Sequence, residues 1–282
     1  MLKSRRAVAA LSGLMFLALI LGSAGIAKAD SFGLGTVAVL GIGSSGVDSQ
    51  SGATVNGALA VAPSGTYSQS GGSISGPVYL YGSYTGSVSG GTNGGIVDST
   101  QSATWASGAT SSLPYSGTVI GSTSVILAGG TQTITATSGG VDVVDLSNLI
   151  ISSGTLDLQD PYAGGQLVLV DSGAFSLSGG AITLTGGYLG PSDVVYDVTS
   201  SASAGSAIDL TGIVYDPTGT VSISGGTVCG EVIGYGVSLS GGTVNACADP
   251  AVSTTPEPSS LLFLGSGMIG LVGLYFRSKI GL

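Results

Sequence analysis

Val221-Ser-Ile-Ser-Gly-Gly-Thr-Val228 and Val237-Ser-Leu-Ser-Gly-Gly-Thr-Val244 are two copies of one segment that differ at a single position. In each copy apolar residues alternate with serine, and this period of two places the first and third residues on one face of a β-strand. The glycine pair lets the chain turn a corner at low steric cost. Stacking the copies as parallel coils places Val237 over Val221 and Leu239 over Ile223, which predicts a β-solenoid.

Related steps recur along most of the chain. Further Ser-Gly-Gly steps lie at 70 to 72, 89 to 91, 138 to 140 and 178 to 180, and Ser-Gly-Thr variants begin at 64, 116 and 153. Repeats of this size with short alternating strands are typical of stacked solenoids. We therefore expect an all-β fold, a right-handed β-solenoid (β-helix), over a body spanning residues 30–250.

One stretch departs from this pattern. Between Gly95 and Leu113 small and apolar residues recur every three to four positions, and Pro114 follows as a stop signal. The spacing predicts a short helix lying along the solenoid, with a long ordered loop as the alternative because Ser and Thr are frequent there. Trp105 is expected to contribute to core packing.

The charge distribution limits what the body can bind. The chain of 282 residues has six Lys and Arg, all in its two end segments, and no His. Of the 15 acidic residues only Glu257 lies outside the body, which therefore carries a charge of about −14. Nucleic acid is excluded as a partner because phosphate binding requires Lys and Arg. A Ser-His-Asp triad is excluded because there is no histidine.

The first 29 residues have the pattern of a secretory signal peptide. Lys3, Arg5 and Arg6 form a positive segment, an apolar stretch follows, and Ala27 and Ala29 match the small-residue rule for signal peptidase. We expect cleavage after Ala29, with an uncleaved N-terminal anchor as the alternative.

The C-terminal end has three parts in a fixed order. A linker at 251–260 contains Pro256-Glu257-Pro258, and the tail at 261–282 has an apolar run from Leu261 to Phe276 before the basic residues Arg277 and Lys279. As a transmembrane helix the apolar run would rise about 24 Å. This arrangement resembles the PEP-CTERM sorting signal of exported bacterial proteins. The resemblance implies export, a membrane-anchored precursor, processing by an exosortase, and a final location in the cell envelope, at the surface or outside the cell.

The body resembles a second group of exported bacterial proteins. The segments Phe32-Gly-Leu-Gly-Thr-Val-Ala-Val-Leu40, Ser176-Leu-Ser-Gly-Gly-Ala-Ile-Thr-Leu184 and Gly212-Ile-Val-Tyr-Asp-Pro-Thr-Gly-Thr-Val221 are similar to β-helix proteins of the anchored-surface and ice-binding-like kinds. This resemblance implies a β-helix with a binding or structural role.

Few residues have the chemistry of a site. Cys229 and Cys247 are expected to form a structural disulfide in an oxidising compartment, with two separate buried thiols as the alternative. No metal site or cofactor is expected beyond weak surface binding of Ca²⁺ by the acidic body. The acidic pairs that could hydrolyse a polysaccharide lie next to turn-forming residues, where Asp is common for structural reasons. These pairs are Asp142 with Asp145, Asp157 with Asp160, and Asp193 with Asp197.

Thr131, Thr133, Thr135 and Thr137 alternate strictly, so on a strand they would present hydroxyl and methyl groups on one face. Such a row suits ice or a sugar polymer, although threonine also favours strands in general. We therefore expect an exported, non-catalytic structural or adhesive protein of the surface or extracellular matrix, with extracellular polysaccharide as a further partner. The alternatives are an ice- or glycan-binding module and a polysaccharide-active enzyme that uses acidic residues.

Overall fold

The computed structural model describes residues 37–43, 47–63, 65–82, 85–110, 117–205 and 208–247. The chain divides into two compact units, Met1–Asp249 and Pro250–Leu282. The predicted signal peptide at 1–29, the linker at 251–260 and the tail at 261–282 lie outside the described residues. Among the residues that are described, no helix combines the length and the apolar character needed to span a bilayer.

The described body is a parallel β-solenoid, as the repeat predicted, and its 17 strands form one continuous sheet. The strands are β1 (Val37–Gly41), β2 (Val47–Gln50), β3 (Thr54–Asn56), β4 (Ala58–Val61), β5 (Thr66–Ile74), β6 (Val78–Leu80), β7 (Thr85–Thr92), β8 (Ile96–Asp98), β9 (Thr118–Thr135), β10 (Val141–Gln159), β11 (Gln166–Leu177), β12 (Gly180–Thr185), β13 (Val194–Val198), β14 (Ala202–Ala204), β15 (Ile208–Thr211), β16 (Ile213–Cys229) and β17 (Val232–Asn245). The helices are α2 (Gln101–Thr110) and the short 3-10 helix η1 (Pro191–Asp193).

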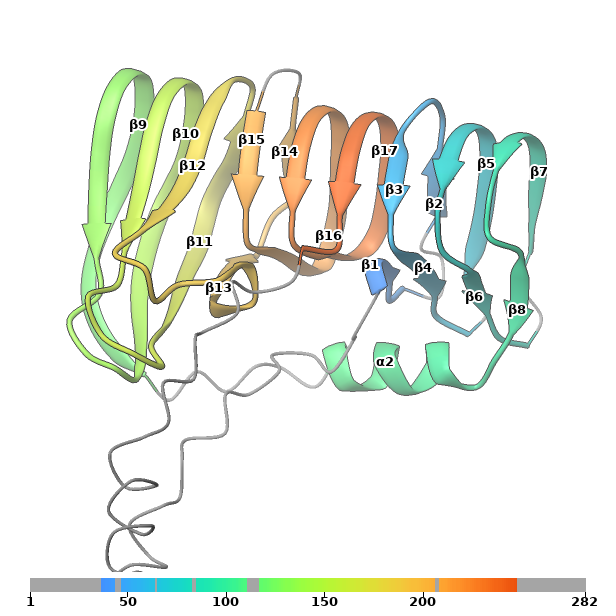
Figure 1. Cartoon of the computed structure of the whole chain (residues 1–282), viewed down its shortest axis with the longest axis horizontal. Helices are drawn as coiled ribbons and strands as arrows, with labels where there is room; N and C mark the ends of the chain where they lie inside the picture. The colour runs from blue at the N-terminus through green and yellow to red at the C-terminus, as the bar shows by residue number, and fades with distance from the viewer. Residues whose placement is uncertain are drawn as a thin grey trace, which may run out of the picture. The chain divides into compact units, whose positions relative to one another are not determined.

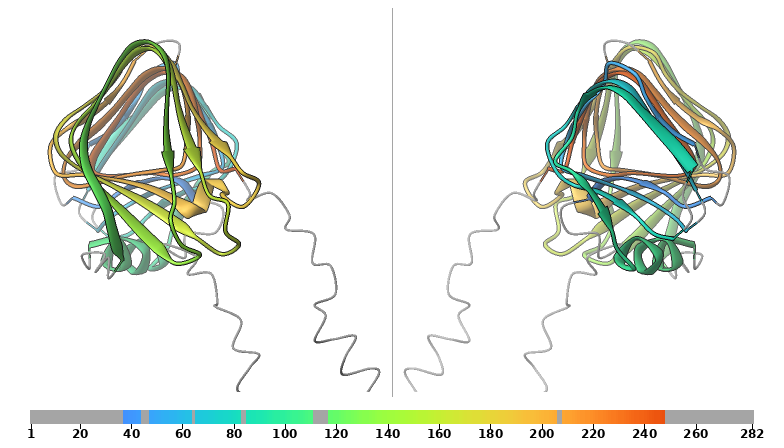
Figure 2. Two further views of the ribbon diagram at one scale, coloured as in Figure 1. Left: turned by 90° about the vertical axis from the view of Figure 1, so that its left-hand side faces the viewer. Right: turned by 90° about the vertical axis from the view of Figure 1, so that its right-hand side faces the viewer.

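Each coil has three sides, and Figure 2 shows the resulting triangular cross-section from both ends. The helix-covered sheet contains β1, β4, β6, β8, β13 and the first segments of the long strands. The serine sheet contains β2, β14 and the middle segments. The threonine sheet contains β3, β12, β15 and the last segments. The long strands, such as β16 and β17, bend around the corners and contribute to all three sheets.

The coils are not stacked in chain order. Parallel pairing begins at β9 and passes to β10. The next coil consists of β11 and β12, and the one after it of β13, β14 and β15. The pairing then passes through β16 and β17 and continues into the coil of β1, β2 and β3. The coils of β4 to β8 follow, so the N-terminal coils form one end of the solenoid and β9 forms the other (Figure 1). β1, the first strand that the structure describes, therefore lies inside the stack between β17 and β4, and the repeat did not indicate this order.

Columns of apolar side chains fill the interior. Val221 pairs with Val237 and Ile223 with Leu239, as the repeat predicted, and all four side chains are buried. Burial of these columns removes apolar surface from water, while every inner strand hydrogen-bonds to both neighbours. In the coil of β5 the buried Gln69 takes the place of an apolar residue, and its amide donates to the carbonyl of Thr92 at 3.1 Å.

The predicted helix alongside the solenoid is α2, which lies against the helix-covered sheet (Figure 1). Ala106 and Ala109 are buried in a second apolar cluster on the outer side of this sheet. The ring of Trp105 packs edge to face on Tyr79 with their centroids 5.1 Å apart, so Trp105 serves in packing. The Tyr215 hydroxyl donates to the carbonyl of Ala109 and fixes the end of the helix. One of the three sheets is thereby covered by a helix.

Candidate functional surface

The outward residues of the threonine sheet form a column that runs from one end of the solenoid to the other. Thr227 pairs with Thr243, and Thr243 pairs with Thr54, so hydroxyl and methyl groups repeat from strand to strand. Adjacent strands lie about 4.8 Å apart, which sets the spacing of the column. In spatial order the column consists of Thr131, Thr155, Ala181, Asp209, Thr227, Thr243, Thr54, Ser73 and Thr92.

A second outward column lies two residues further along the same strands, or about 6.6 Å away at 3.3 Å per residue. Near the β9 end it holds Thr133, Asp157 and Thr183, and further along it holds Asn245 and Asn56. The Asp157 carboxylate accepts hydrogen bonds from the Thr183 hydroxyl at 3.4 Å and the Thr185 hydroxyl at 2.8 Å. The two columns make a two-dimensional array on one sheet.

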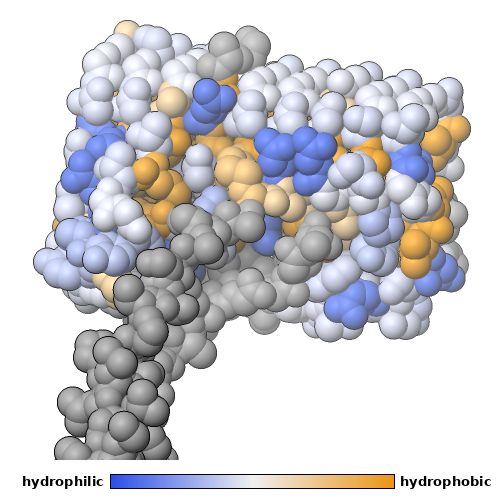
Figure 3. All heavy atoms as spheres, viewed as in Figure 1, coloured by the Kyte–Doolittle hydropathy of each residue, from blue (hydrophilic) through white to orange (hydrophobic). Residues whose placement is uncertain are grey.

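The array is rigid for two reasons. Threonine is β-branched, so its χ1 angle is restricted, and each inner strand is held on both sides by backbone pairing. The buried residues between the outward ones, such as Val228 and Val244, anchor the strands in the core. Figure 3, viewed toward this sheet, shows mostly intermediate hydropathy with scattered hydrophilic and hydrophobic patches. The surface therefore presents threonine hydroxyl and methyl groups at strand spacing, with Asp157, Asp209 and Asn245 among them.

The serine sheet has a comparable column of smaller side chains. Ser176, Ser203, Ser222 and Ser238 follow one another in register, and the column continues through the β2 position of Ser49 to Ser68 and Ser87. At the β9 end Ile126 and Ile150 take the place of serine. A serine hydroxyl has no methyl group beside it, so this sheet offers hydroxyls without the apolar component of the threonine sheet.

The predicted threonine row lies on β9, at one end of the threonine sheet. Thr131, Thr133 and Thr135 are exposed on this strand, whereas Thr137 lies beyond it and its hydroxyl donates to the Asp142 carboxylate at 3.2 Å. The extended array runs across strands and not along one. The sequence signal that identifies the column is the residue directly after each glycine pair, as at Thr92, Thr131, Thr227 and Thr243.

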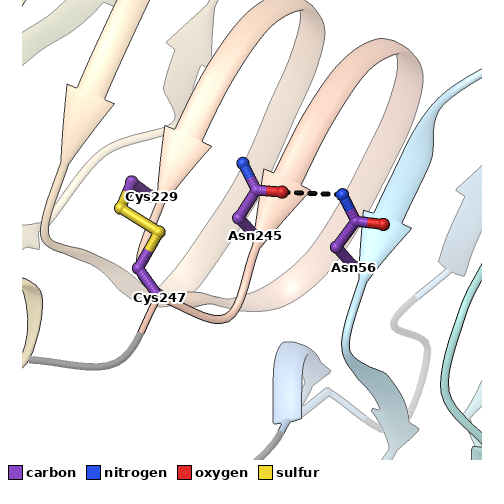
Figure 4. Close-up of a disulfide and its surroundings, with 4 residues drawn as sticks. All are labelled: Asn56, Cys229, Asn245 and Cys247. Carbon is purple, nitrogen blue, oxygen red and sulfur yellow. Dashed lines mark hydrogen bonds between the residues drawn. A yellow bond between two sulfur atoms is a disulfide. The ribbon is translucent and has the colours of Figure 1, made fainter.

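Cys229 and Cys247 form a disulfide with their Cα atoms 5.2 Å apart (Figure 4). Cys229 pairs with Asn245 across β16 and β17, which is the register that the repeat predicted. On the next strand the Asn56 amide donates to the Asn245 side-chain oxygen at 2.7 Å. This hydrogen bond joins β17 to the N-terminal coils.

The two members of each acidic pair that the sequence suggested differ in burial, and Asp197 is half-buried in β13 whereas Asp193 is buried. Asp142 is buried while Asp145 is exposed, and Asp157 lies on the threonine sheet while Asp160 is buried. Asp193 is buried in η1, and its carboxylate accepts from the Gly190 amide at 2.8 Å. Burial raises the pKa of Asp160, and the nearby carboxylates of Asp142 and Asp193 raise it further. No cluster of three or more potential metal ligands occurs in the described parts of the chain.

Burial also raises the pKa of three further carboxyl groups, Asp171, Asp197 and Asp216. Asp216 accepts hydrogen bonds from the Gly219 amide at 2.6 Å and the Thr218 amide at 3.2 Å, which oppose the effect of burial. The carboxyl groups of Asp171 and Asp216 accept hydrogen bonds from backbone amides two or three residues further along the chain and so stabilise turns.

The comparisons with known proteins concern the tail and the body separately. Residues 254–279 match the family model of the PEP-CTERM protein-sorting motif. The chain therefore carries the sorting signal of an exported, surface-directed protein, and the motif implies processing by an exosortase. No curated protein sequence matches the chain.

The body is similar to solved structures of ice-binding proteins. One is from the Antarctic ascomycete Antarctomyces psychrotrophicus, with 20% identity, a TM-score of 0.48, and coverage of 79% of this chain and 97% of that chain. A second, from an Antarctic biological consortium, has 19% identity, a TM-score of 0.42, and coverage of 78% and 89%. A third, from an Arctic yeast, has 15% identity, a TM-score of 0.41, and coverage of 76% and 96%.

Proposed function

We propose that this exported, PEP-CTERM-sorted protein binds ice through its threonine sheet. The observation that carries the proposal is the outward column in which threonine occupies six of the nine positions, one strand spacing apart. Ice presents oxygen atoms at regular intervals, so a rigid array of hydroxyl and methyl groups can order water over many contacts at once. Each hydroxyl can hydrogen-bond to a water molecule of the ice surface in place of another water. Each methyl group fills the space beside it and excludes liquid water there.

The composition of the sheet favours ice over a charged or sugar ligand. Its outward columns contain no Lys, Arg or His, and their acidic members in the described strands are Asp157 and Asp209. Among these same outward positions no aromatic ring is available on which a sugar could stack. The proposed role is non-catalytic, because the buried carboxylates Asp142 and Asp193 accept hydrogen bonds from nearby turns. A structural or adhesive role in the matrix stays a prediction from the sequence.

The test is a pair of matched double variants on the same two strands. Thr227→Lys with Thr243→Lys places two long cationic side chains in the centre of the threonine sheet. Ser222→Lys with Ser238→Lys places the same charges on β16 and β17 but on the serine sheet. We expect incorporation into a growing ice front and thermal hysteresis to fall about tenfold or more in the threonine variant only.

Three results would contradict this proposal. The unsubstituted protein could fail to enter ice. Both double variants could bind ice as well as the unsubstituted protein. The Ser222→Lys, Ser238→Lys variant could lose binding while the Thr227→Lys, Thr243→Lys variant keeps it. Retention on immobilised polysaccharide without ice incorporation would favour the glycan-binding alternative.

A further inference from the structure

The two ends of the solenoid expose strand edges that have no partner among the described residues. β9 pairs with β10 alone, β7 with β5 alone, and β8 with β6 alone. Figure 1 shows β9 at one end and β7 with β8 at the other. An unpaired edge presents a row of free N–H and C=O groups, which is a template for a further strand.

The end formed by β7 and β8 also exposes side chains that belong to interior columns. Val88 continues the column of Leu239, Gln50 and Gln69, whose members are at most 2% exposed, yet Val88 is 47% exposed. Ile96 continues the column of the buried Val78 and is 45% exposed. The apolar core is therefore open at this end.

The opposite end supplies the complementary positions. In the same two columns β9 carries Leu127, a core residue, and Gly121, where an added Cβ would meet no atom within 4 Å. Edge strands of soluble proteins are commonly protected by charge or proline. β9 has neither, and Asp98 is the single charged residue of β7 and β8. Nothing in these strands opposes the approach of one end to the other.

The solenoid already contains a junction of this type. β17 pairs in parallel with β1, β2 and β3, although these segments lie at opposite ends of the folded sequence. Val232 continues into Val39, Thr243 into Thr54, and the amide of Asn56 bonds to Asn245. Coil stacking in this protein therefore does not require that the coils be consecutive in the chain.

We propose that copies of this protein stack head to tail, with β9 of one copy pairing in parallel with β7 and β8 of the next. Leu127 then lies over Val88, the open position at Gly121 receives Ile96, and Thr131 continues the threonine column from Thr92. Such a contact joins two different surfaces, so it does not close on itself and generates a filament. The proposal is independent of ice binding, but each junction would lengthen the threonine sheet.

The first experiment measures assembly of the exported protein by sedimentation velocity and electron microscopy, without ice. Val88→Glu with Ile96→Glu places charges in the exposed core, and both sites tolerate polar groups in the monomer because they are half exposed. Tyr162→Glu with Tyr188→Glu adds the same charge at similarly exposed positions, 45% and 43%, outside β7, β8 and β9. We expect the control variant to form rods. The Val88→Glu, Ile96→Glu variant is expected to associate at least about tenfold more weakly.

A covalent trap tests the register. Thr92→Cys and Thr131→Cys in one chain place thiols at opposite ends of the solenoid but on adjacent strands of a stacked pair, about 4.8 Å apart. Oxidation is expected to give a ladder of multimers that reducing agent dissolves, whereas either single variant stays without a ladder. Monomers at every concentration would overturn the proposal. Filaments that form equally well with the Val88→Glu, Ile96→Glu variant would also overturn it. Slow amide exchange of β7 and β8 in the monomer would do the same, because it would show that another segment of the chain already covers this end.

Discussion

At the residue scale, the glycine pairs determine how closely the coils approach. Gly226 has a φ of 72°, and an added Cβ would lie 2.2 Å from the Ile208 carbonyl oxygen of the neighbouring coil. The backbone of β15 is held by its own pairing and cannot yield to this contact. The second glycine of the repeat is thus required both by its conformation and by its neighbour.

A comparison of two alanine variants separates these effects. Gly130 has a φ of 76° but no atom within 4 Å of an added Cβ, so Gly130→Ala is expected to cost about 1–2 kcal/mol from conformation alone. Gly226→Ala adds a backbone collision and is expected to cost at least about 1 kcal/mol more. Urea unfolding of both variants measures the difference. Equal losses would show that the close approach of the coils is unimportant.

Also at this scale, the residue after the glycine pair has a role that a single segment does not show. Thr227 and Thr243 follow identical glycine pairs and become neighbours on the threonine sheet. The row from Thr131 to Thr135 stands out by its alternation within one strand, yet the longer array runs between strands. Alternation along the sequence reveals which face a residue occupies, whereas its neighbours on that face depend on coil stacking.

At the scale of the elements, the disulfide fastens the last coil to the one before it. Cys229 ends β16, and Cys247 follows β17 at a separation of 18 residues. β17 holds the N-terminal coils through backbone pairing and the Asn56–Asn245 hydrogen bond, so loosening its end would affect both halves of the solenoid. The cross-link therefore lies beside the junction of the two chain segments.

Replacement of both cysteines by serine is expected to lower the free energy of unfolding by about 2–4 kcal/mol, because the unfolded chain is no longer restrained. Denaturant unfolding with and without a reducing agent measures this effect. The serine variant serves as the control, since reductant has no bond to break in it. An unchanged midpoint on reduction of the native protein would contradict the expectation.

At the scale of the whole molecule, the body has many carboxylates and no base to neutralise them. Burial raises the pKa of Asp160, Asp171, Asp197 and Asp216 in the folded state. Between the unfolded pKa of about 3.9 and the raised folded pKa, the folded protein binds more protons than the unfolded chain. The contribution of these four groups to stability therefore falls as the pH rises through this window and is constant outside it.

We expect the melting temperature to be higher near pH 4 than near pH 7, which is opposite to the usual acid denaturation. Asp216→Asn keeps an oxygen that can accept from Gly219 but removes the charge, so it should reduce the slope and raise stability at neutral pH. Calorimetry across this range measures both effects. A melting temperature that increases with pH would show that repulsion and burial of these carboxyls are minor.

The sequence by itself determined the local structure of this protein: the strands, their inward residues, the pairing of β16 with β17, and the short helix. These features follow from alternation, from glycine and from spacing within one or two repeats, so neighbouring residues carry the information. The tertiary structure decided the order of the coils, the different burial of the paired acidic residues and the columns that cross the sheets. These features depend on contacts between segments far apart in the chain, such as Thr54 and Thr243, and no local pattern determines which coil stacks on which.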